Sequence, residues 1–126
     1  MKIRIKGNAI RFRLTQSEVN YFSENGQLQE KTEFGNGELK YAIISSINHE
    51  TLSVEWANNT ILLNIPAMVA NNWTTTNLVG LEARQPLGNG KELFLLIEKD
   101  FKCLDATTED QSDNYPNPLA EKHQNG

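Results

Sequence analysis

Two similar segments fill most of this chain of 126 residues, and this internal repeat constrains the fold more than any other feature. Each segment reads as a strand, a short helix and two further strands, and Gly-Asn-Gly separates the last two strands, at 35–37 and again at 88–90. Phe22 of the first helix corresponds to Trp73 of the second as an aromatic anchor. Two such units can close an antiparallel sheet into a barrel, which removes exposed strand edges. We therefore expect an α+β fold of mostly antiparallel strands with two short helices, built from a duplicated strand–helix–strand–strand unit and barrel-like in shape.

Local signals place the individual elements. Thr15-Gln-Ser-Glu18 is a capping box and Gly26 is a typical helix stop, so a helix is expected over 16–24. Pro66 favours the start of a second helix over 66–73. The continuous Phe-Leu-Leu-Ile run at 94–97 predicts a central strand covered on both faces. Beyond the opening hairpin, the expected strands are 28–34, 38–46, 51–57, 60–65, 78–84 and 91–101.

The length is that of one domain, and the composition changes near residue 101. We expect a single duplicated domain over 1–101 and a polar C-terminal tail over 102–126. The composition favours a solvated tail, although Tyr115 and Pro116 offer a way to dock it against the barrel. The four tail carboxylates are oxygen ligands suited to Ca²⁺ or Mg²⁺, but the segment lacks the glycine and the closing glutamate of an EF-hand loop. These carboxylates are Asp105, Glu109, Asp110 and Asp113.

Several functional classes have no support in the sequence. The single cysteine, Cys103, excludes an internal disulfide and gives no pair for a zinc site. No run reaches the roughly 18 apolar residues of a membrane span, and the charged start from Lys2 is unlike a secretory signal, so we expect a cytoplasmic protein. Hydrolase, phosphate-loop and zinc-protease motifs are absent, and neither His49 nor His123 has a nucleophile flanking it. We therefore expect no cofactor, no metal and no catalytic residue, and leave the oligomeric state open.

The opening strands carry the sharpest candidate site. Five of the 12 Lys and Arg residues lie in the first 13 positions and alternate with apolar residues on either side of a Gly7-Asn8 turn. With that turn, Arg4 faces Arg11 and Lys2 faces Arg13, and like charges directly opposite each other destabilise a sheet. A carboxylate or a bound anion must therefore compensate. The basic row consists of Lys2, Arg4, Lys6, Arg11 and Arg13.

Two interpretations of the basic row stay open. In the first, its arginine forks and lysines bind a carboxylate or phosphate ligand. In the second, which is the more common use of such a row, it pairs with acids of a neighbouring strand. Glu98 and Asp100 have the right alternation on the last strand, and Glu82 and Glu55 are further candidates. Nucleic acid matches poorly as a partner, because residues 17–126 carry 16 acids against seven bases.

Six stretches of the chain form a recognisable set: Met1-Lys-Ile-Arg-Ile-Lys-Gly-Asn8, Ile10-Arg-Phe-Arg-Leu-Thr15, Phe34-Gly-Asn-Gly37, Gln85-Pro-Leu-Gly-Asn-Gly90, Glu98-Lys-Asp-Phe-Lys-Cys-Leu104 and Glu109-Asp-Gln-Ser-Asp-Asn-Tyr-Pro-Asn-Pro118. Together they resemble a small family of uncharacterised bacterial proteins. The resemblance covers nearly the whole chain and includes the tail, so it implies that the tail belongs to the folded unit. It implies no established activity.

The duplicated plan with its charged rows also resembles the CYTH, or triphosphate tunnel, superfamily, whose wide antiparallel barrels bind or hydrolyse triphosphates. This resemblance implies a tunnel lined by the basic row, and a triphosphatase in which Glu82, Glu98 and Asp100 hold a metal. The chain departs from that superfamily in its first strand, which carries lysine and arginine in place of alternating glutamates. A third likeness is that of Asn64-Ile-Pro-Ala-Met-Val-Ala70 to the strand–proline–helix step of AbrB-type DNA-binding barrels, although residues 60–83 contain no Lys or Arg.

These observations predict a non-catalytic cytoplasmic module that binds a small anionic or phosphorylated ligand on its basic hairpin face. The donors would be the five residues of the basic row. One alternative is a metal-dependent, triphosphatase-like enzyme of CYTH type. Another is a protein-interaction module whose charged sheet face is paired internally.

Overall fold

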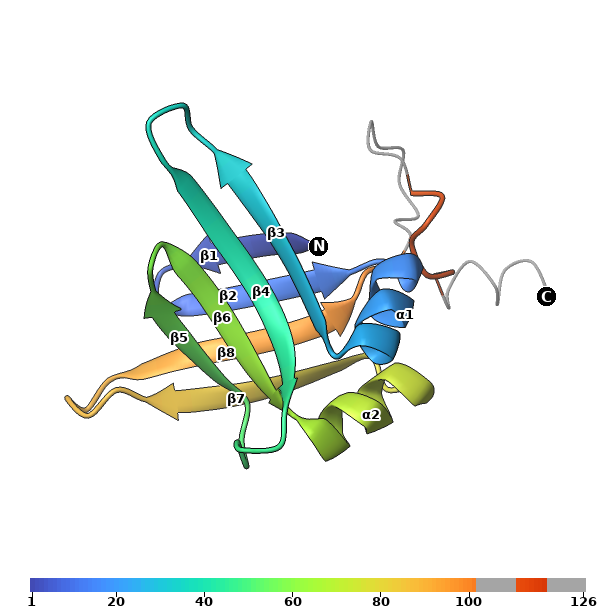
Figure 1. Ribbon diagram of the computed structural model, residues 1–126. Helices are drawn as coiled ribbons and strands as arrows, with labels where there is room; N and C mark the ends of the chain where they lie inside the picture. The colour runs from blue at the N-terminus through green and yellow to red at the C-terminus, as the bar shows by residue number, and fades with distance from the viewer. Residues whose placement is uncertain (102–110, 118–126) are drawn as a thin grey trace.

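The computed structural model describes residues 1–101 and 111–117. In this part, the chain forms two hairpin–helix–hairpin halves (Figure 1). The first half contains β1 (Lys2–Lys6), β2 (Ala9–Leu14), α1 (Gln16–Asn25), β3 (Gln27–Glu33) and β4 (Glu38–Ser46). The second half contains β5 (Ser53–Ala57), β6 (Thr60–Pro66), α2 (Ala67–Thr75), β7 (Gly80–Pro86) and β8 (Glu92–Lys99).

The strands form two four-stranded sheets, and each sheet takes one hairpin from each half. Sheet A has the order β1-β2-β8-β7, and sheet B has the order β3-β4-β6-β5. The hairpins are antiparallel, whereas the central pairs, β2 with β8 and β4 with β6, are parallel. The expected α+β class, with mostly antiparallel strands and two short helices, is confirmed.

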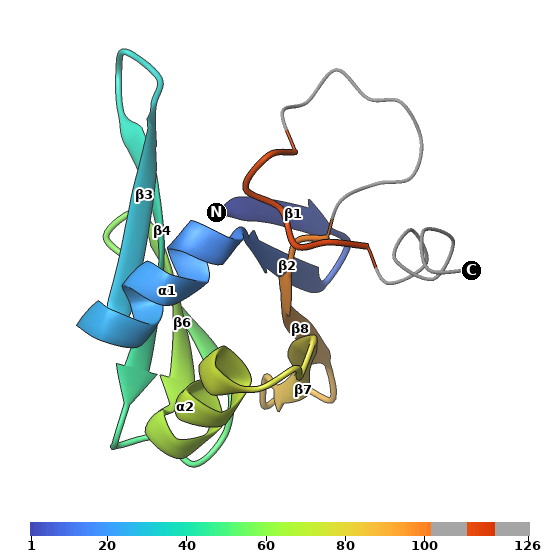
Figure 2. The same ribbon diagram turned by 90° about the vertical axis from the view of Figure 1, so that its right-hand side faces the viewer.

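The expected barrel is wrong, because the two sheets pack face to face with their strands crosswise and do not close on each other (Figures 1 and 2). Each helix carries the chain from one sheet to the other, so the two hairpins of one half cannot pair together. Strands β1, β7, β3 and β5 therefore remain as sheet edges. The repeat is also longer than predicted, since β1 and β5 precede the strand–helix–strand–strand unit in the two halves.

Buried apolar side chains fill the space between the sheets. In β2, Phe12 and Leu14 point inward and alternate with the two arginines of the strand, as the twofold periodicity of a strand requires. The helices lie together at one end of the stack (Figure 2), where the rings of Phe22 and Trp73 are 6.4 Å apart. The largest fully buried side chains are Trp73, Phe12, Phe22, Leu14, Ile43, Leu63, Ile65, Leu95, Ile97 and Val19.

Helix α1 begins and ends where the sequence signals predicted. The Thr15 N–H donates to Oε1 of Glu18 at 2.9 Å, and Gly26 ends the helix with φ of 73°. Glu18 also contacts the α-ammonium of Met1, which joins the start of β1 to the helix. Burial alone would raise the pKa of Glu18, but the hydrogen bonds from the ammonium and from Thr15 hold it below its ordinary value. Helix α2 follows Pro66 directly.

Residues 111–117 pack against the end of β8 and the start of α1. The Tyr115 N–H donates to the carbonyl oxygen of Asp100 at 2.8 Å, and its ring lies 5.6 Å from that of Phe101. This contact is the docking through Tyr115 that the sequence offered as an alternative. The division of the chain at residue 101 stays a prediction. Three of the four tail carboxylates lie outside the described residues: Asp105, Glu109 and Asp110.

Asp113 caps α1 from outside the helix. The first N–H groups of a helix have no partner within it. Here the Gln16 N–H donates to the carbonyl oxygen of Asp113 at 3.0 Å, and the Ser17 N–H donates to its Oδ1 at 3.2 Å. The hydroxyl of Ser17, followed by that of Thr15, holds the pKa of the Asp113 carboxyl below its ordinary value.

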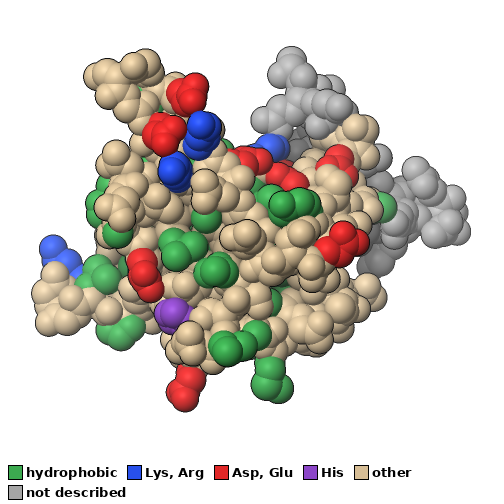
Figure 3. Space-filling model, in the orientation of Figure 1, with side chains coloured by type: hydrophobic (Ala, Val, Ile, Leu, Met, Phe, Trp, Pro, Cys, Tyr) green, Lys and Arg blue, Asp and Glu red, His purple; other side chains and the backbone are tan. Residues whose placement is uncertain are grey.

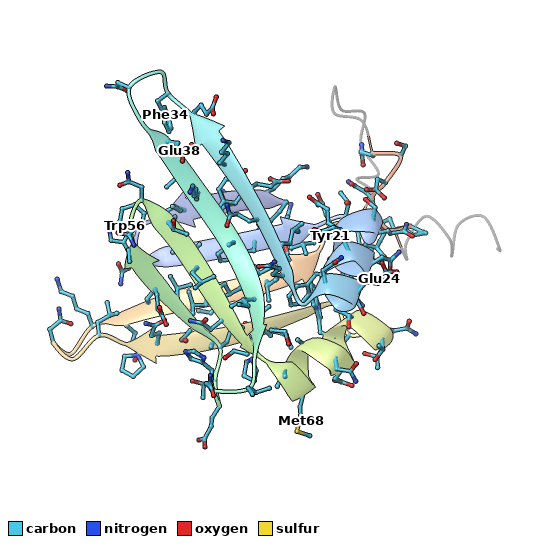
Figure 4. All side chains as sticks on the ribbon, viewed as in Figure 1. Tyr21, Glu24, Phe34, Glu38, Trp56 and Met68 are labelled. Carbon is cyan, nitrogen blue, oxygen red and sulfur yellow. The ribbon has the colours of Figure 1, made fainter. Side chains whose placement is uncertain are left out.

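The substitution Asp113→Asn is expected to cause a modest loss of stability at pH 7 that disappears in acid. A carboxyl whose pKa is lower in the folded state contributes stability above its unfolded pKa, and this contribution is lost as the pH falls through the folded value. Urea unfolding at pH 7 and near pH 2.5 measures the difference. Glu24→Gln, at an exposed position of α1 (Figure 4), is the matched control and should change little. An equal loss at both pH values would contradict a role for the charge.

Candidate functional site

The basic row lies on the β1–β2 hairpin in the register that the Gly7-Asn8 turn predicted. Arg4 is paired with Arg11, and Lys2 with Arg13. Cross-strand partners point to the same side of a sheet. The row therefore lies on the side of sheet A that faces away from sheet B, opposite the face shown in Figure 3. We call this side the basic face, defined by Lys2, Arg4, Lys6, Arg11 and Arg13.

Three rows of side chains cross the basic face from β1 through β2 to β8. The first row is charged throughout, the second changes from cationic to apolar at β8, and the third already does so at β2. From β1 to β8 the rows are Lys2, Arg13 and Glu98; Arg4, Arg11 and Leu96; and Lys6, Ala9 and Phe94. Strand β7 extends the second row with Glu82 and the third with Arg84.

Two carboxylates neutralise part of the basic face, and both are those that the alternation of the last strand predicted. Glu98 lies 2.6 Å from Nη2 of Arg11 and accepts a hydrogen bond from Nε of Arg13 at 2.7 Å. Lys2 Nζ lies 3.2 Å from Oδ2 of the buried Asp100. Part of the compensation for the like charges is therefore internal.

Arg4 and Lys6 differ from the other three bases. Both are exposed, and no carboxylate within residues 1–101 and 111–117 forms an ion pair with either of them. The buried Nε of Arg11 also makes no hydrogen bond to the described residues. Three of the five bases are thus paired with Glu98 or Asp100, whereas Arg4 and Lys6 leave positive charge on the β1 side of the second and third rows.

Two adjoining pockets open on the basic face, and Arg4 and Arg11 line both. The first, of about 290 Å³, is lined by Lys2, Ile3, Arg4, Arg11 and Arg13. The second, of about 320 Å³, is lined by Arg4, Lys6, Ala9, Ile10, Arg11, Phe94 and Leu96. The second pocket therefore combines cationic walls with an apolar floor.

The apolar floor is the part of the site that sequence reasoning missed. The run at 94–97 predicted a strand covered on both faces, and this is wrong: Leu95 and Ile97 are fully buried, but Phe94 and Leu96 are only half-buried on the basic face. The guanidinium of Arg84 lies 5.9 Å from the centroid of the Phe94 ring. The sequence holds no signal for this floor, because all four residues of the run are apolar and nothing in the run marks which face stays open.

The matching face of sheet B lacks these cations. The Gly7-Asn8 turn corresponds to Asn58-Asn59 in the second half, and both asparagines adopt positive φ. By this correspondence, the positions of Arg4, Arg11 and Arg13 are occupied by Glu55, Leu62 and Asn64. The bases of sheet B lie near the β3–β4 tip instead, mixed with acids as Figure 3 shows, in contacts of 3.3–3.6 Å among Lys31, Lys40, Glu33 and Glu38. The fold itself therefore does not require a basic face.

A second polar cluster lies at the end of β4. Oγ of Ser46 is 2.7 Å from Nδ1 of His49, whose Nε2 is 3.7 Å from Glu55. His49 thus has a hydroxyl neighbour that the sequence did not suggest. The Ser46 hydroxyl also accepts a hydrogen bond from the Asn48 N–H at 3.2 Å, so it closes a local turn. Within the described residues, no group of three His, Cys, Asp or Glu side chains is placed to hold a metal ion.

A family model matches residues 1–119 of the chain. The chain belongs to DUF7009, a family of unknown function. Membership of DUF7009 confirms the expectation of an uncharacterised family, whereas bacterial origin and the likeness to the CYTH superfamily stay predictions. No curated protein and no solved structure matches this member of DUF7009. Neither helix in the described part of the chain has the length and hydropathy to cross a membrane.

Proposed function

We propose that this member of DUF7009 is a non-catalytic cytoplasmic module that binds a small anionic or phosphorylated ligand on its basic face. The observation that carries the proposal is the pair Arg4 and Lys6, exposed beside a pocket and without an ion-pair partner in the described chain. Arg4 also stands directly opposite Arg11. A bound anion would offset this repulsion between like charges.

The side chains have distinct roles in such a site. Arg4 and Arg11 line both pockets, and a guanidinium presents paired N–H donors that match two oxygens of a phosphate or carboxylate. Lys6 adds a mobile point charge at the edge of the larger pocket. Glu98 forms an ion pair of 2.6 Å with Arg11 and so competes with an anionic ligand for this guanidinium. Lys2 and Arg13, which are paired with Asp100 and Glu98, add positive potential to the smaller pocket.

A thermal-shift measurement with tripolyphosphate tests the proposal. A ligand that binds only the native state, at 100 times its Kd, adds about 2.7 kcal/mol to the free energy of unfolding. We expect the unfolding midpoint to rise by several degrees at low salt, and by less at high salt because exposed charges are screened. Arg4→Ala should weaken binding tenfold or more.

The control variant is Lys91→Ala, which removes an exposed cation from the β7–β8 loop. It changes the net charge by the same amount but leaves the basic face intact, so it should keep the shift. Loss of the shift in both variants would mean that only overall charge matters. No shift of the wild-type chain with tripolyphosphate, at any salt concentration, would overturn the proposal.

A second candidate function is a protein-interaction module with an internally paired face. The ion pairs of Glu98 with Arg11 and of Asp100 with Lys2 favour it. The two candidates predict different results with tripolyphosphate. If the basic face is already neutralised by its own carboxylates, an added anion should not raise the unfolding midpoint. That outcome would redirect the search to protein partners.

A further inference from the structure

The larger pocket of the basic face is divided between two chemistries. One side is formed by the side chains of Arg4, Lys6 and Arg11, which are cationic. The other side is the apolar floor, which is formed by Phe94 and Leu96. An inorganic anion would use only the first side and would leave the apolar floor in water. A ligand that uses the whole pocket must therefore carry an anionic group and an apolar group.

The order of the third row suggests the shape of that ligand. Ala9 lies between Lys6 on β1 and Phe94 on β8, and it is the smallest side chain of the row. Neighbouring strands are about 4.8 Å apart, so β1 and β8 are separated by about 10 Å across this gap. A small linking group over Ala9 would connect an anion held at β1 with a flat group resting on β8.

The surroundings of Phe94 favour a flat, π-bonded group. Its ring faces outward, and the guanidinium of Arg84 lies over it at 5.9 Å from the centroid in a cation–π contact. Aromatic rings and arginine planes are the two side-chain surfaces on which nucleobases stack. Leu96 extends the apolar surface along β8 beside the ring.

Size and charge favour a single nucleotide over a nucleic-acid strand. The pocket of about 320 Å³ is at the lower end of the range for small-molecule sites. A polyanion would also extend beyond the basic face, and residues 17–126 carry 16 acids against seven bases. The positive charge is confined to a patch that suits one phosphorylated group.

We infer that the ligand of the basic face is a mononucleotide, with its phosphate at Arg4, Lys6 and Arg11 and its base on Phe94 and Leu96. The inference rests on the proposed function and adds the class of ligand. It makes Phe94 a specificity residue that distinguishes a nucleotide from other phosphates.

Calorimetric titration with AMP, ribose 5-phosphate and inorganic phosphate tests the inference, because the three probes share the phosphate and only AMP carries the base. We expect AMP to bind about tenfold more tightly than ribose 5-phosphate. Phe94→Ala should remove this difference and leave the affinity for ribose 5-phosphate unchanged. Phe94→Leu keeps an apolar side chain in the half-buried position, so it should fold as the wild-type chain does. It should also reduce the difference in affinity between AMP and ribose 5-phosphate, which would show that the effect of Phe94→Ala is not a folding defect. Phe34→Ala, on an exposed phenylalanine at the β3–β4 tip (Figure 4), is the matched control and should bind as wild type.

The possible outcomes distinguish failure of the nucleotide assignment from failure of the proposed function. Equal binding of AMP and ribose 5-phosphate to the wild-type chain would overturn the nucleotide assignment and leave the anion site intact. Failure of all three probes, together with tripolyphosphate, would overturn both. Binding of a short single-stranded oligonucleotide without any binding of AMP would also overturn the mononucleotide assignment.

Discussion

Trp73→Ala is expected to lower the free energy of unfolding by about 3–5 kcal/mol, the range for removing a buried aromatic side chain. Trp73 is the largest of the fully buried side chains, at 0% exposure. Its ring contacts Phe22 of the other helix, and its Nε1 donates to the carbonyl oxygen of Val79 at 3.0 Å. The substitution thus removes the contact that joins the two helices and the turn before β7. Because small domains are stable by only about 5–15 kcal/mol, the loss is a large fraction of the total.

Urea unfolding followed by far-ultraviolet circular dichroism measures this loss. The matched control is the other tryptophan, Trp56 on β5, which is 64% exposed (Figure 4). Trp56→Ala should change the free energy of unfolding by less than about 1 kcal/mol. The Val79 carbonyl oxygen also accepts a hydrogen bond from the Lys99 N–H, so it keeps a partner in the variant. Similar losses in the two variants would show that the helix pair is not the centre of the core.

Glu98→Gln is expected to change stability and ligand affinity in opposite directions. Glu98 is 16% exposed at its side chain and contacts both Arg11 and Arg13. Removing its charge leaves the two arginines without their carboxylate, at an expected loss of about 2–3 kcal/mol. The same change removes the internal competitor for Arg11. We therefore expect tripolyphosphate to bind several-fold more tightly than to the wild-type chain.

Glu82→Gln is the matched control for Glu98→Gln, because Glu82 extends the second row of the same face and has no ion pair among the described residues. It removes the same charge without breaking a pair, so the stability should change little. Urea denaturation and tripolyphosphate titration are compared for the wild-type chain and the two variants. The comparison distinguishes an effect of overall charge from the effect of freeing the two arginines. Weaker anion binding by Glu98→Gln would mean that Glu98 supports the ligand instead of competing with it.

Local features of the fold could be predicted because short-range chemistry determines them. The Gly7-Asn8 turn fixed the register of the first hairpin, and Thr15, Glu18 and Gly26 fixed the limits of α1. The pairing of β2 with β8 could not be predicted, since alternation tells which face a side chain occupies but not which strand lies beside it. The expectation of a barrel was wrong for the same reason, because the sequence does not show which strands lie side by side.

The candidate site, too, could be predicted only in part from the sequence. Its cations could be found by counting alternate positions, which also placed Glu98 and Asp100 among four candidate partners. Only the pairing of β2 with β8 distinguishes these two from Glu82 and Glu55. Phe94 and Leu96 were missed because an uninterrupted apolar run gives no sign of which face is open. The cap that Asp113 places on α1 could not be foreseen, because it joins residues almost a hundred positions apart that no periodic pattern connects.

The exchange of hairpins between the halves has a consequence for the order of folding during synthesis. Sheet B is complete once β6 has been made, but sheet A needs β8, and the contact of Arg13 with Glu98 spans 85 residues. Such distant pairings are slow to form. The β1–β2 hairpin, the earliest of these elements to be made, must therefore wait for its neighbours with its strand edges unpaired. Charged side chains on an exposed strand edge oppose pairing with another strand, so the five positive charges of this hairpin would repel a second copy during this interval.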